Sequence, residues 1–170
     1  IATRFNYFFG ETFVVPKHRI REAGARIMGL DDPTAKMSKS TTTTGHAIYL
    51  LDSPKTVRKA IMRAVTDTGC ELRWEQASPG VRNLLTIFSV ISGEDKAAIG
   101  ARYDGRGYGY LKKDLADAME DTLAPIRAEF ARYHDDKAEL DRALDAGAER
   151  ARGIADPILR RAQIAAGLGR

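Results

Sequence analysis

The sequence predicts a mostly α-helical protein whose helices follow a shorter segment of strand character. From Ser53 to the end, apolar residues recur with the 3.6-residue period of amphipathic helices. Before Ser53, the apolar runs at 12–15 and 25–28 are short and bounded by glycine or proline, which is typical of strands. The polar run from Lys36 to Gly45 lies between these two parts and predicts a loop.

The first third of the chain is predicted to contain one helix besides these two strands. Residues 1–9 carry apolar side chains at helical spacing, and the pattern stops at Gly10. The β-rich run at 12–15 ends at Pro16, and the polar, basic stretch 16–24 predicts a loop. The run at 25–28 is long enough for one buried strand.

Three shorter helices are predicted next. Ser53 is suited to cap a helix whose first residue is Pro54 and which the turn at 66–69 closes. A second helix covers 81–91 and ends at Gly93. Ser92 is predicted to cap a short helix that reaches about residue 102.

Two long helices complete the pattern. The first follows an apolar stripe from Leu111 to Tyr133 and is predicted to be kinked at Pro125. The second begins at Asp135 or Asp136, and Pro157 restarts or bends its last part. We expect the two to be antiparallel and to form a small bundle with the shorter helices. The residues of the second that are predicted to face its core are Leu140, Ala143, Leu144, Ala148 and Ala151.

Composition excludes several kinds of site. The chain has 170 residues, 44% of them hydrophobic, so it can bury a core. Cys70 is the only cysteine, which rules out a disulfide within the chain and a thiolate cluster. The three histidines, 18, 46 and 134, have no second ligand at i+3 or i+4, so we predict surface or packing roles and no metal site. No apolar run is long enough to span a membrane, which predicts a cytoplasmic protein.

Positive charge is concentrated at the start of the chain. Residues 1–63 contain eleven Lys and Arg against five Asp and Glu, whereas the remainder contains sixteen against eighteen. This imbalance predicts a polyanionic partner such as ATP or nucleic acid, with an ordinary solvated surface as the alternative. The chain also opens at Ile1 within a helical pattern and without an initiator methionine, so we expect it to be part of a longer protein.

The polar loop contains the run Lys36-Met37-Ser38-Lys39-Ser40. Two ammonium groups and two hydroxyls on a flexible segment can close over a polyphosphate and withdraw from it. They can stabilise negative charge that develops on a leaving pyrophosphate, which is an electrostatic rather than a covalent role. A basic loop without function is the alternative.

The surroundings of this run resemble one family. The segment Gly24–Leu30, followed by Pro33 and the Lys36–Ser40 run, resembles the part of tryptophanyl-tRNA synthetases that leads from the last Rossmann strand into the class I KMSKS loop. Residues 63–68 resemble the AVTD segment of that family. Residues 83–87 and 108–112 resemble its NLL and YG…K segments. The resemblance extends from about residue 1 to 150 and fades where Pro157 departs from the family pattern.

The resemblance implies a division of the chain and a reaction. Residues 1–45 would be the end of a Rossmann-type catalytic domain, and residues 46–170 a helical-bundle anticodon-binding domain. The implied activity is that of a tryptophan–tRNA ligase, which uses ATP and Mg²⁺ to form the tryptophan adenylate and then transfers tryptophan to tRNA. Family members are homodimers, so a homodimer is implied for the full-length protein.

The resemblance also implies roles for individual residues. Lys36, Ser38 and Lys39 would engage the ATP phosphates, with Met37 and Ser40 completing the loop. Lys36 and Lys39 would be the catalytic residues, and Lys39 would lie closest to the leaving pyrophosphate. Backbone groups of Ile27 and Met28 would meet the adenine; plain core packing of these two is the alternative, and both can hold together.

Some parts of the family pattern are missing or altered. The HIGH-type motif does not occur in this sequence, and the tryptophan pocket would lie in the same absent half, so we expect residues 1–170 alone to be inactive. Thr41 follows the loop where many relatives have an acidic residue, which puts the anchoring of the loop in question.

The helical part carries no catalytic constellation, and the resemblance assigns it to tRNA recognition. Its candidate tRNA-binding residues are Arg58, Lys59 and Arg63, although a purely solvated face is equally compatible with the pattern. Two other functions stay open. One is a class I synthetase of the tyrosine type, and the other is a free-standing RNA-binding or interaction module without catalytic activity.

Overall fold

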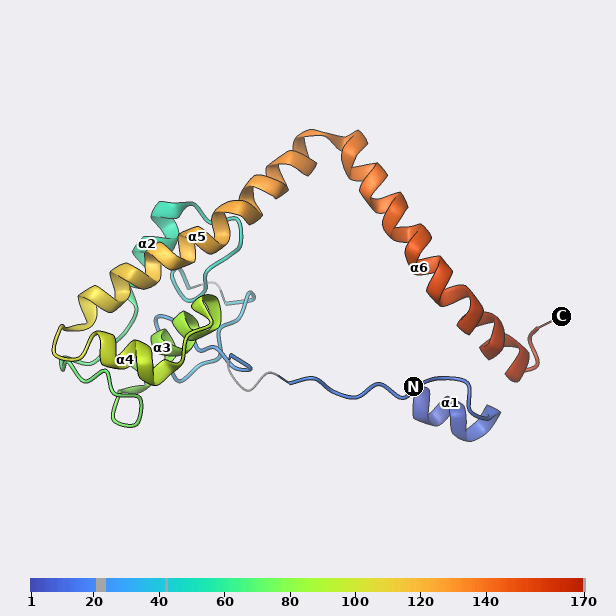
Figure 1. The fold of residues 1–170 in the computed structure, drawn as a ribbon, viewed down its shortest axis with the longest axis horizontal. Coiled ribbons are helices and arrows are strands. Elements are labelled where there is room, and N and C mark those ends of the chain that lie inside the picture. The colour runs from blue at the N-terminus through green and yellow to red at the C-terminus, as the bar shows by residue number, and fades with distance from the viewer. Residues whose placement is uncertain (21–23, 42, 170) are drawn as a thin grey trace. The chain divides into compact units, whose positions relative to one another are not determined.

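The computed structural model describes residues 1–20, 24–41 and 43–169, and in these ranges the protein is helical, as predicted (Figure 1). Residues 21–23 and 42, which belong to the two predicted loops, lie outside the described residues. The helices in the described ranges are α1 (Ala2–Phe9), α2 (Pro54–Arg63), α3 (Pro79–Ser92), α4 (Lys96–Arg102), α5 (Tyr108–Asp135) and α6 (Lys137–Ala165).

The chain divides into two compact units. One consists of residues 1–19 and 131–170, and the other of residues 20–130. The second unit therefore includes residues on both sides of the predicted domain boundary at 45–46, and that boundary stays a prediction.

The two predicted strands are wrong, because neither run finds a partner strand in the described chain. The run at 12–15 is irregular and bends back onto α1, where the side chain of Asn6 accepts from the N–H groups of Thr12 and Phe13 at 3.2 and 3.0 Å. The run at 25–28 forms only an isolated antiparallel bridge between Met28 and Lys36. A β-rich composition fits a pleated surface but does not supply the second strand that hydrogen bonding requires.

The predicted starts and ends of the shorter helices hold with two corrections. Ser53 caps α2 by accepting from the Thr56 N–H, and α3 ends at Gly93 with a left-handed φ of 74°. However, α2 ends at Arg63, before the predicted turn. The cap of α4 is Asp95 and not Ser92, because a carboxylate accepts from two amide groups at once, those of residues 97 and 98.

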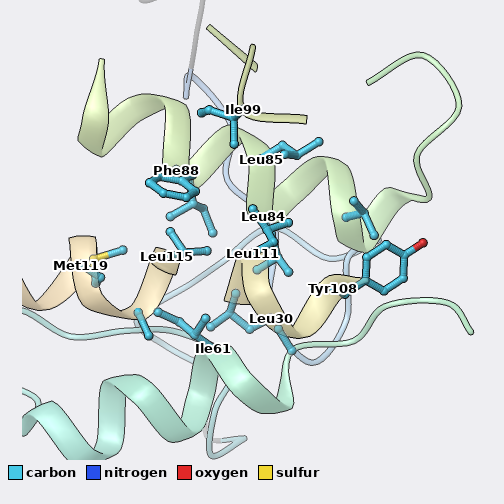
Figure 2. Packing of buried hydrophobic residues seen from close by; sticks show 14 of the residues in the cluster. Leu30, Ile61, Leu84, Leu85, Phe88, Ile99, Tyr108, Leu111, Leu115 and Met119 are labelled. Carbon is cyan, nitrogen blue, oxygen red and sulfur yellow. The ribbon is translucent and has the colours of Figure 1, made fainter. Parts of the chain in front are cut away.

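The core of the second unit lies between α2, α3, α4 and α5. Figure 2 shows Leu84 of α3 beside Leu111 of α5, and Leu85 of α3 near Ile99 of α4, and all four are almost completely buried. Leu30, from the segment before the Lys36–Ser40 loop, belongs to the same cluster. The loop is therefore joined at its base to the best-packed part of the protein.

Two of the segments that carry the family resemblance contact each other in this core. The ammonium group of Lys112 donates to the Ala64 carbonyl at 2.8 Å and to the Thr66 hydroxyl at 3.1 Å, just beyond the end of α2. The Tyr108 hydroxyl donates to Asp67 at 2.7 Å, and burial together with this bond raises the pKa of Tyr108 to about 12. The AVTD and YG…K segments therefore form one packing contact between α2 and α5.

The first unit is much less buried. The helix α6 continues without a break through Pro157, but Ala162 is the only one of its described residues that is buried. Leu140 and Leu144, which the periodicity predicts to face a core, are exposed. An amphipathic pattern identifies the apolar face of a helix and does not identify what packs against it, so the exposure of Leu140 and Leu144 could not be predicted from the pattern.

Close packing between α3 and the end of α2 gives a first testable prediction. A Cβ on Gly80 would lie 2.0 Å from the Val65 carbonyl oxygen, so Gly80→Ala must displace backbone and should destabilise the second unit by about 1–3 kcal/mol. Urea unfolding followed by the fluorescence of Trp74, the single tryptophan, measures the change.

Gly109→Ala is the matched control, because Gly109 is also helical, lies in the same unit and has no atom within 4 Å of its Cβ position. This variant should be neutral or more stable by up to about 1 kcal/mol. Equal stability of the two variants would contradict the packing described for Gly80.

Candidate functional site

The Lys36–Ser40 loop extends from a short paired base. The Gly29 N–H donates to the Ala35 carbonyl at 2.8 Å, and the Met37 N–H donates to the Ile27 carbonyl at 3.0 Å. Asp32 closes the turn between the two sides by accepting from the backbone and the hydroxyl of Thr34. These bonds to Thr34 lower the pKa of Asp32. The start of the loop is therefore fixed although its tip is polar and open.

Asn83 of α3 takes the place of a neighbouring strand on this base. Its side-chain oxygen accepts from the Met28 N–H at 2.9 Å, and its amide nitrogen donates to the Met28 carbonyl at 2.8 Å and to the Gly29 carbonyl at 3.4 Å. The side chain is buried. The bonds cross 55 positions of sequence, so nothing in the local pattern around Asn83 indicates them.

The backbone groups of Ile27 and Met28, which are the predicted adenine contacts, differ in whether they are already hydrogen-bonded. Both backbone groups of Met28 are engaged by Asn83, and the Ile27 carbonyl is engaged by Met37. Within the described residues, the Ile27 N–H has no hydrogen-bond partner. Ile27 can therefore offer its N–H to a base without loss of an existing bond, whereas Met28 can do so only if Asn83 releases it.

The five loop residues lie together as the sequence predicts, and their side chains differ in exposure. Lys36 and Lys39 are exposed, and neither has an ion pair within the described chain. Met37 packs against the core cluster. The Ser38 hydroxyl accepts from the Ser40 N–H at 3.2 Å, which tightens the turn between the two lysines. The loop thus presents two exposed ammonium groups on a segment anchored by one apolar side chain.

His46 lies beneath the loop and is buried, a placement that the sequence did not reveal. Its Nδ1 lies 2.6 Å from the Asp31 carboxylate, and its Nε2 lies 3.3 Å from the Lys36 carbonyl oxygen. The bond to Asp31 is the largest cause of a raised pKa of His46. Its contacts lie 15 and 10 positions away, and they depend on how the chain returns after the loop.

A cavity of about 550 Å³ lies between the residues that follow the loop and α2. Lys55, Lys59 and Arg63 line it at successive i+4 positions of α2, and none of the three has an ion pair within the described chain. Arg58 does not line the cavity, and its guanidinium donates to Asp117 of α5 instead. Of the three residues predicted to bind tRNA, Lys59 and Arg63 therefore line the cavity and Arg58 does not. Lys55, which was not predicted, lines the cavity with them.

The described residues contain neither a metal cluster nor a membrane span. No group of three or more His, Cys, Asp or Glu side chains in the described ranges is arranged to hold a metal ion. No helix in the same ranges is both long enough and apolar enough to cross a membrane.

Comparison with known proteins gives the family context. A family model described as tRNA synthetases class I (W and Y) matches residues 1–124. The tryptophan–tRNA ligase of Listeria monocytogenes is 46% identical over 171 residues, which cover 100% of this chain and 51% of the ligase. That of Leifsonia xyli is 46% identical over 168 residues, covering 98% and 50%. The chain thus spans about half the length of the curated relatives it matches, and the similarity includes the last 20 residues, where we expected it to fade.

Solved structures agree with the fold. The tryptophanyl-tRNA synthetase of Mycoplasma pneumoniae superposes with a TM-score of 0.83 at 29% identity, covering 99% of this chain and 52% of that one. The Campylobacter jejuni enzyme complexed with ADP and tryptophan superposes with a TM-score of 0.64 at 28% identity, covering 98% and 51%.

The role of Asn83 gives a second prediction. Asn83→Leu keeps a buried side chain of similar size but leaves the Met28 N–H and carbonyl without partners, which should cost about 1–3 kcal/mol for each unsatisfied group. Urea unfolding monitored by Trp74 fluorescence measures the loss. Gln76→Leu replaces an exposed amide in the same unit and should change stability by less than about 0.5 kcal/mol. Similar stability of both variants would show that Asn83 does not support the base of the loop.

Proposed function

Because this chain belongs to the class I tRNA synthetases of the tryptophan and tyrosine family, we propose that it forms part of a tryptophan–tRNA ligase. In the proposed reaction a tryptophan carboxylate oxygen attacks the α-phosphorus of ATP, pyrophosphate leaves, and the adenylate then passes tryptophan to a tRNA hydroxyl with release of AMP. The observation that carries the proposal is the Lys36–Ser40 loop, which holds two exposed ammonium groups on an anchored base. The names of the relatives favour tryptophan over tyrosine.

The loop would act on the phosphates. Lys36, Ser38 and Lys39 donate to phosphate oxygens, with Ser40 completing the turn, and Lys39 stabilises charge on the departing pyrophosphate. Met37 stays against the core and limits how far the loop can move. Mg²⁺ would be held by the phosphate oxygens and water, as is usual for this ion, and would neutralise part of their charge.

Adenine recognition would use the base of the loop. The N–H of Ile27 has no partner within the described chain and is the donor we propose for the base. Met28 contributes indirectly, because Asn83 holds its backbone and thereby fixes the adjacent peptide of Ile27.

The cavity beside α2 would receive tRNA phosphates. Lys55, Lys59 and Arg63 line one cavity wall and have no carboxylate partner among the described residues, so their charge is available to a polyanion. The charge of Arg58 is compensated by Asp117, and we therefore remove Arg58 from the predicted set. We also propose that the helices after residue 46 contribute to anticodon recognition, and that the complete ligase is a homodimer that acts in the cytoplasm.

A free-standing RNA-binding module is the second candidate function. The cations of the cavity would serve it equally well, but it gives no reason for the anchored Lys36–Ser40 loop. An assay of the complete ligase distinguishes the two candidates. In that protein this chain would be joined to a half that carries the HIGH motif and the tryptophan pocket. Tryptophan-dependent ATP–pyrophosphate exchange by that protein is expected only for a synthetase.

The loop gives a third prediction. In the complete ligase, Lys39→Ala removes an ammonium group from the leaving pyrophosphate and should lower ATP–pyrophosphate exchange about 10²–10³-fold. The affinity for tryptophan should change little, because the amino acid lies elsewhere. Lys113→Ala, which removes an exposed lysine of α5, should leave exchange unaltered. Full exchange by the Lys39 variant would take Lys39 out of the mechanism.

The cavity gives a fourth prediction. Replacing Lys55, Lys59 and Arg63 together by Gln should weaken tRNA binding and flatten its salt dependence, by about 0.7–0.9 in log–log slope for each phosphate that is no longer neutralised. Binding across a salt series measures both effects, and exchange, which needs no tRNA, should stay near that of the parent. Arg58→Gln is the control and should bind tRNA normally. If the triple variant binds tRNA like the parent at every salt, the cavity cations are a solvated surface.

A further inference from the structure

We propose that His46 is a positioning residue of the Lys36–Ser40 loop, because its ring joins the Lys36 carbonyl to the Asp31 carboxylate and fixes the direction in which the loop leaves its base. The effect of this contact on catalysis rests on the proposed function. The contact itself does not, and it can be tested without any activity.

The ring of His46 is buried and lies against the backbone of Gly29. It is buried at 4% relative exposure, and it occupies the space that a side chain on Gly29 would fill. A Cβ on Gly29 would lie 2.4 Å from the His46 ring carbon Cε1. The backbone of His46 is fixed as well, because its carbonyl accepts from the Leu30 N–H at 3.0 Å. Because the ring and the backbone of His46 are both fixed, the ring can hold the Lys36 carbonyl at a constant position relative to the Asp31 carboxylate.

The two partners of the ring are both acceptors. A carboxylate oxygen lies at 2.6 Å from Nδ1 and a carbonyl oxygen at 3.3 Å from Nε2. Neutral imidazole has one N–H, so it can satisfy only one of the two, whereas imidazolium donates to both. The complete contact between Asp31, His46 and Lys36 therefore requires the protonated ring.

The charges around the ring favour that form. Asp31 and Asp32 lie on the turn beside it and raise its pKa, against the opposing effect of burial. From α2, Lys55, Lys59 and Arg63 line the same cavity as Asp31, and nearby positive charge in general disfavours a protonated imidazole. The bond to Asp31 is the largest of these influences, and the net effect is a raised pKa of His46.

Deprotonation would break one side of the contact. The remaining proton stays on Nδ1, which faces the carboxylate, and Nε2 then presents a lone pair to the Lys36 carbonyl. A group with a raised folded-state pKa stabilises the fold fully below its unfolded pKa of about 6.5, and this contribution is lost as pH rises through the folded pKa. The base of the loop should therefore loosen on the alkaline side and not on the acid side.

Loosening at Lys36 would affect the chemistry at Lys39. The two lysines are separated by two residues, so a change in the direction of the Lys36 peptide displaces both ammonium groups relative to the phosphates. A misplacement of about 1 Å can cost on the order of 10²-fold in rate. In the complete ligase His46→Leu, which has no donor for the Lys36 carbonyl, should lower kcat of exchange about 10- to 100-fold and raise KM for ATP, with KM for tryptophan unchanged.

The contact can be tested in the 170-residue chain alone. Imidazole NMR titration should give His46 a pKa above the ordinary histidine value of about 6.5. Trypsin should cleave after Lys36 faster in His46→Leu than in the control His18→Leu at the same pH, because leucine has no donor for the scissile carbonyl. A pKa of His46 at or below about 6.5, or equal cleavage of the two variants, would overturn the proposal.

The complete ligase provides the second test. Exchange by the parent should fall on the alkaline side with the pKa measured for His46, and Asp31→Asn, which keeps the ring and its space, should move this fall to lower pH. His18→Gln should retain the parent profile. A fall that Asp31→Asn does not move would overturn the positioning role of His46. Absence of exchange in every form, with the NMR and trypsin results as expected, would instead contradict the proposed function and leave the contact standing.

Discussion

The backbone of residues 28–30 needs hydrogen-bond partners, and in the described chain an isolated bridge supplies only the bond from the Gly29 N–H to the Ala35 carbonyl. Three separate segments supply the others: Asn83 of α3 binds Met28, the His46 carbonyl accepts from Leu30, and the Val65 N–H donates to the Leu30 carbonyl. Unpaired buried backbone groups are costly, so each of these contacts is held strongly. The base of the Lys36–Ser40 loop is therefore the point where α3, the end of α2 and the return of the loop meet.

This meeting point gives a polar loop a rigid base. Val65 belongs to the segment that follows α2, and Lys112 of α5 holds the same segment through the Ala64 carbonyl. Burial of the Lys112 ammonium group lowers its pKa, and its bonds to oxygen atoms offset that cost. A continuous set of contacts thus connects the base of the loop to the longest helix of the second unit. The side chain of Lys39, at the tip of the loop, remains exposed, and the Tyr49 hydroxyl donates to its backbone carbonyl at 3.4 Å.

Local signals predicted the helices and the loop, whereas long-range contacts could not be predicted. Apolar periodicity placed α2 and α3, and Ser53 and Gly93 marked one end of each. The run at 25–28 has the composition of a strand, but its partner is the side chain of Asn83, 55 positions away from Met28. For α6 the periodicity identified an apolar face correctly, yet whether that face is covered depends on neighbours that a helical pattern does not specify. The contacts of His46 could not be predicted for the same reason. Its burial and its two acceptors set it apart from the other histidines, and neither can be inferred from its neighbours in the sequence.

Ion pairing distinguishes two kinds of cation on α2 that composition does not distinguish. Arg58, Lys59 and Arg63 are equivalent in sequence, but Arg58 is paired with Asp117 and contributes little field to an approaching ligand. The cations that line the cavity have no ion pair in the part of the chain that the structure describes. Asp31 and Asp52 line the same cavity, so their carboxylates offset only part of the mutual repulsion of the three cations until an anion arrives. A polyanion that enters the cavity relieves this repulsion and gains the attraction of all three side chains. The same reasoning applies to the loop lysines 36 and 39, whose exposed ammonium groups are equally available to phosphate.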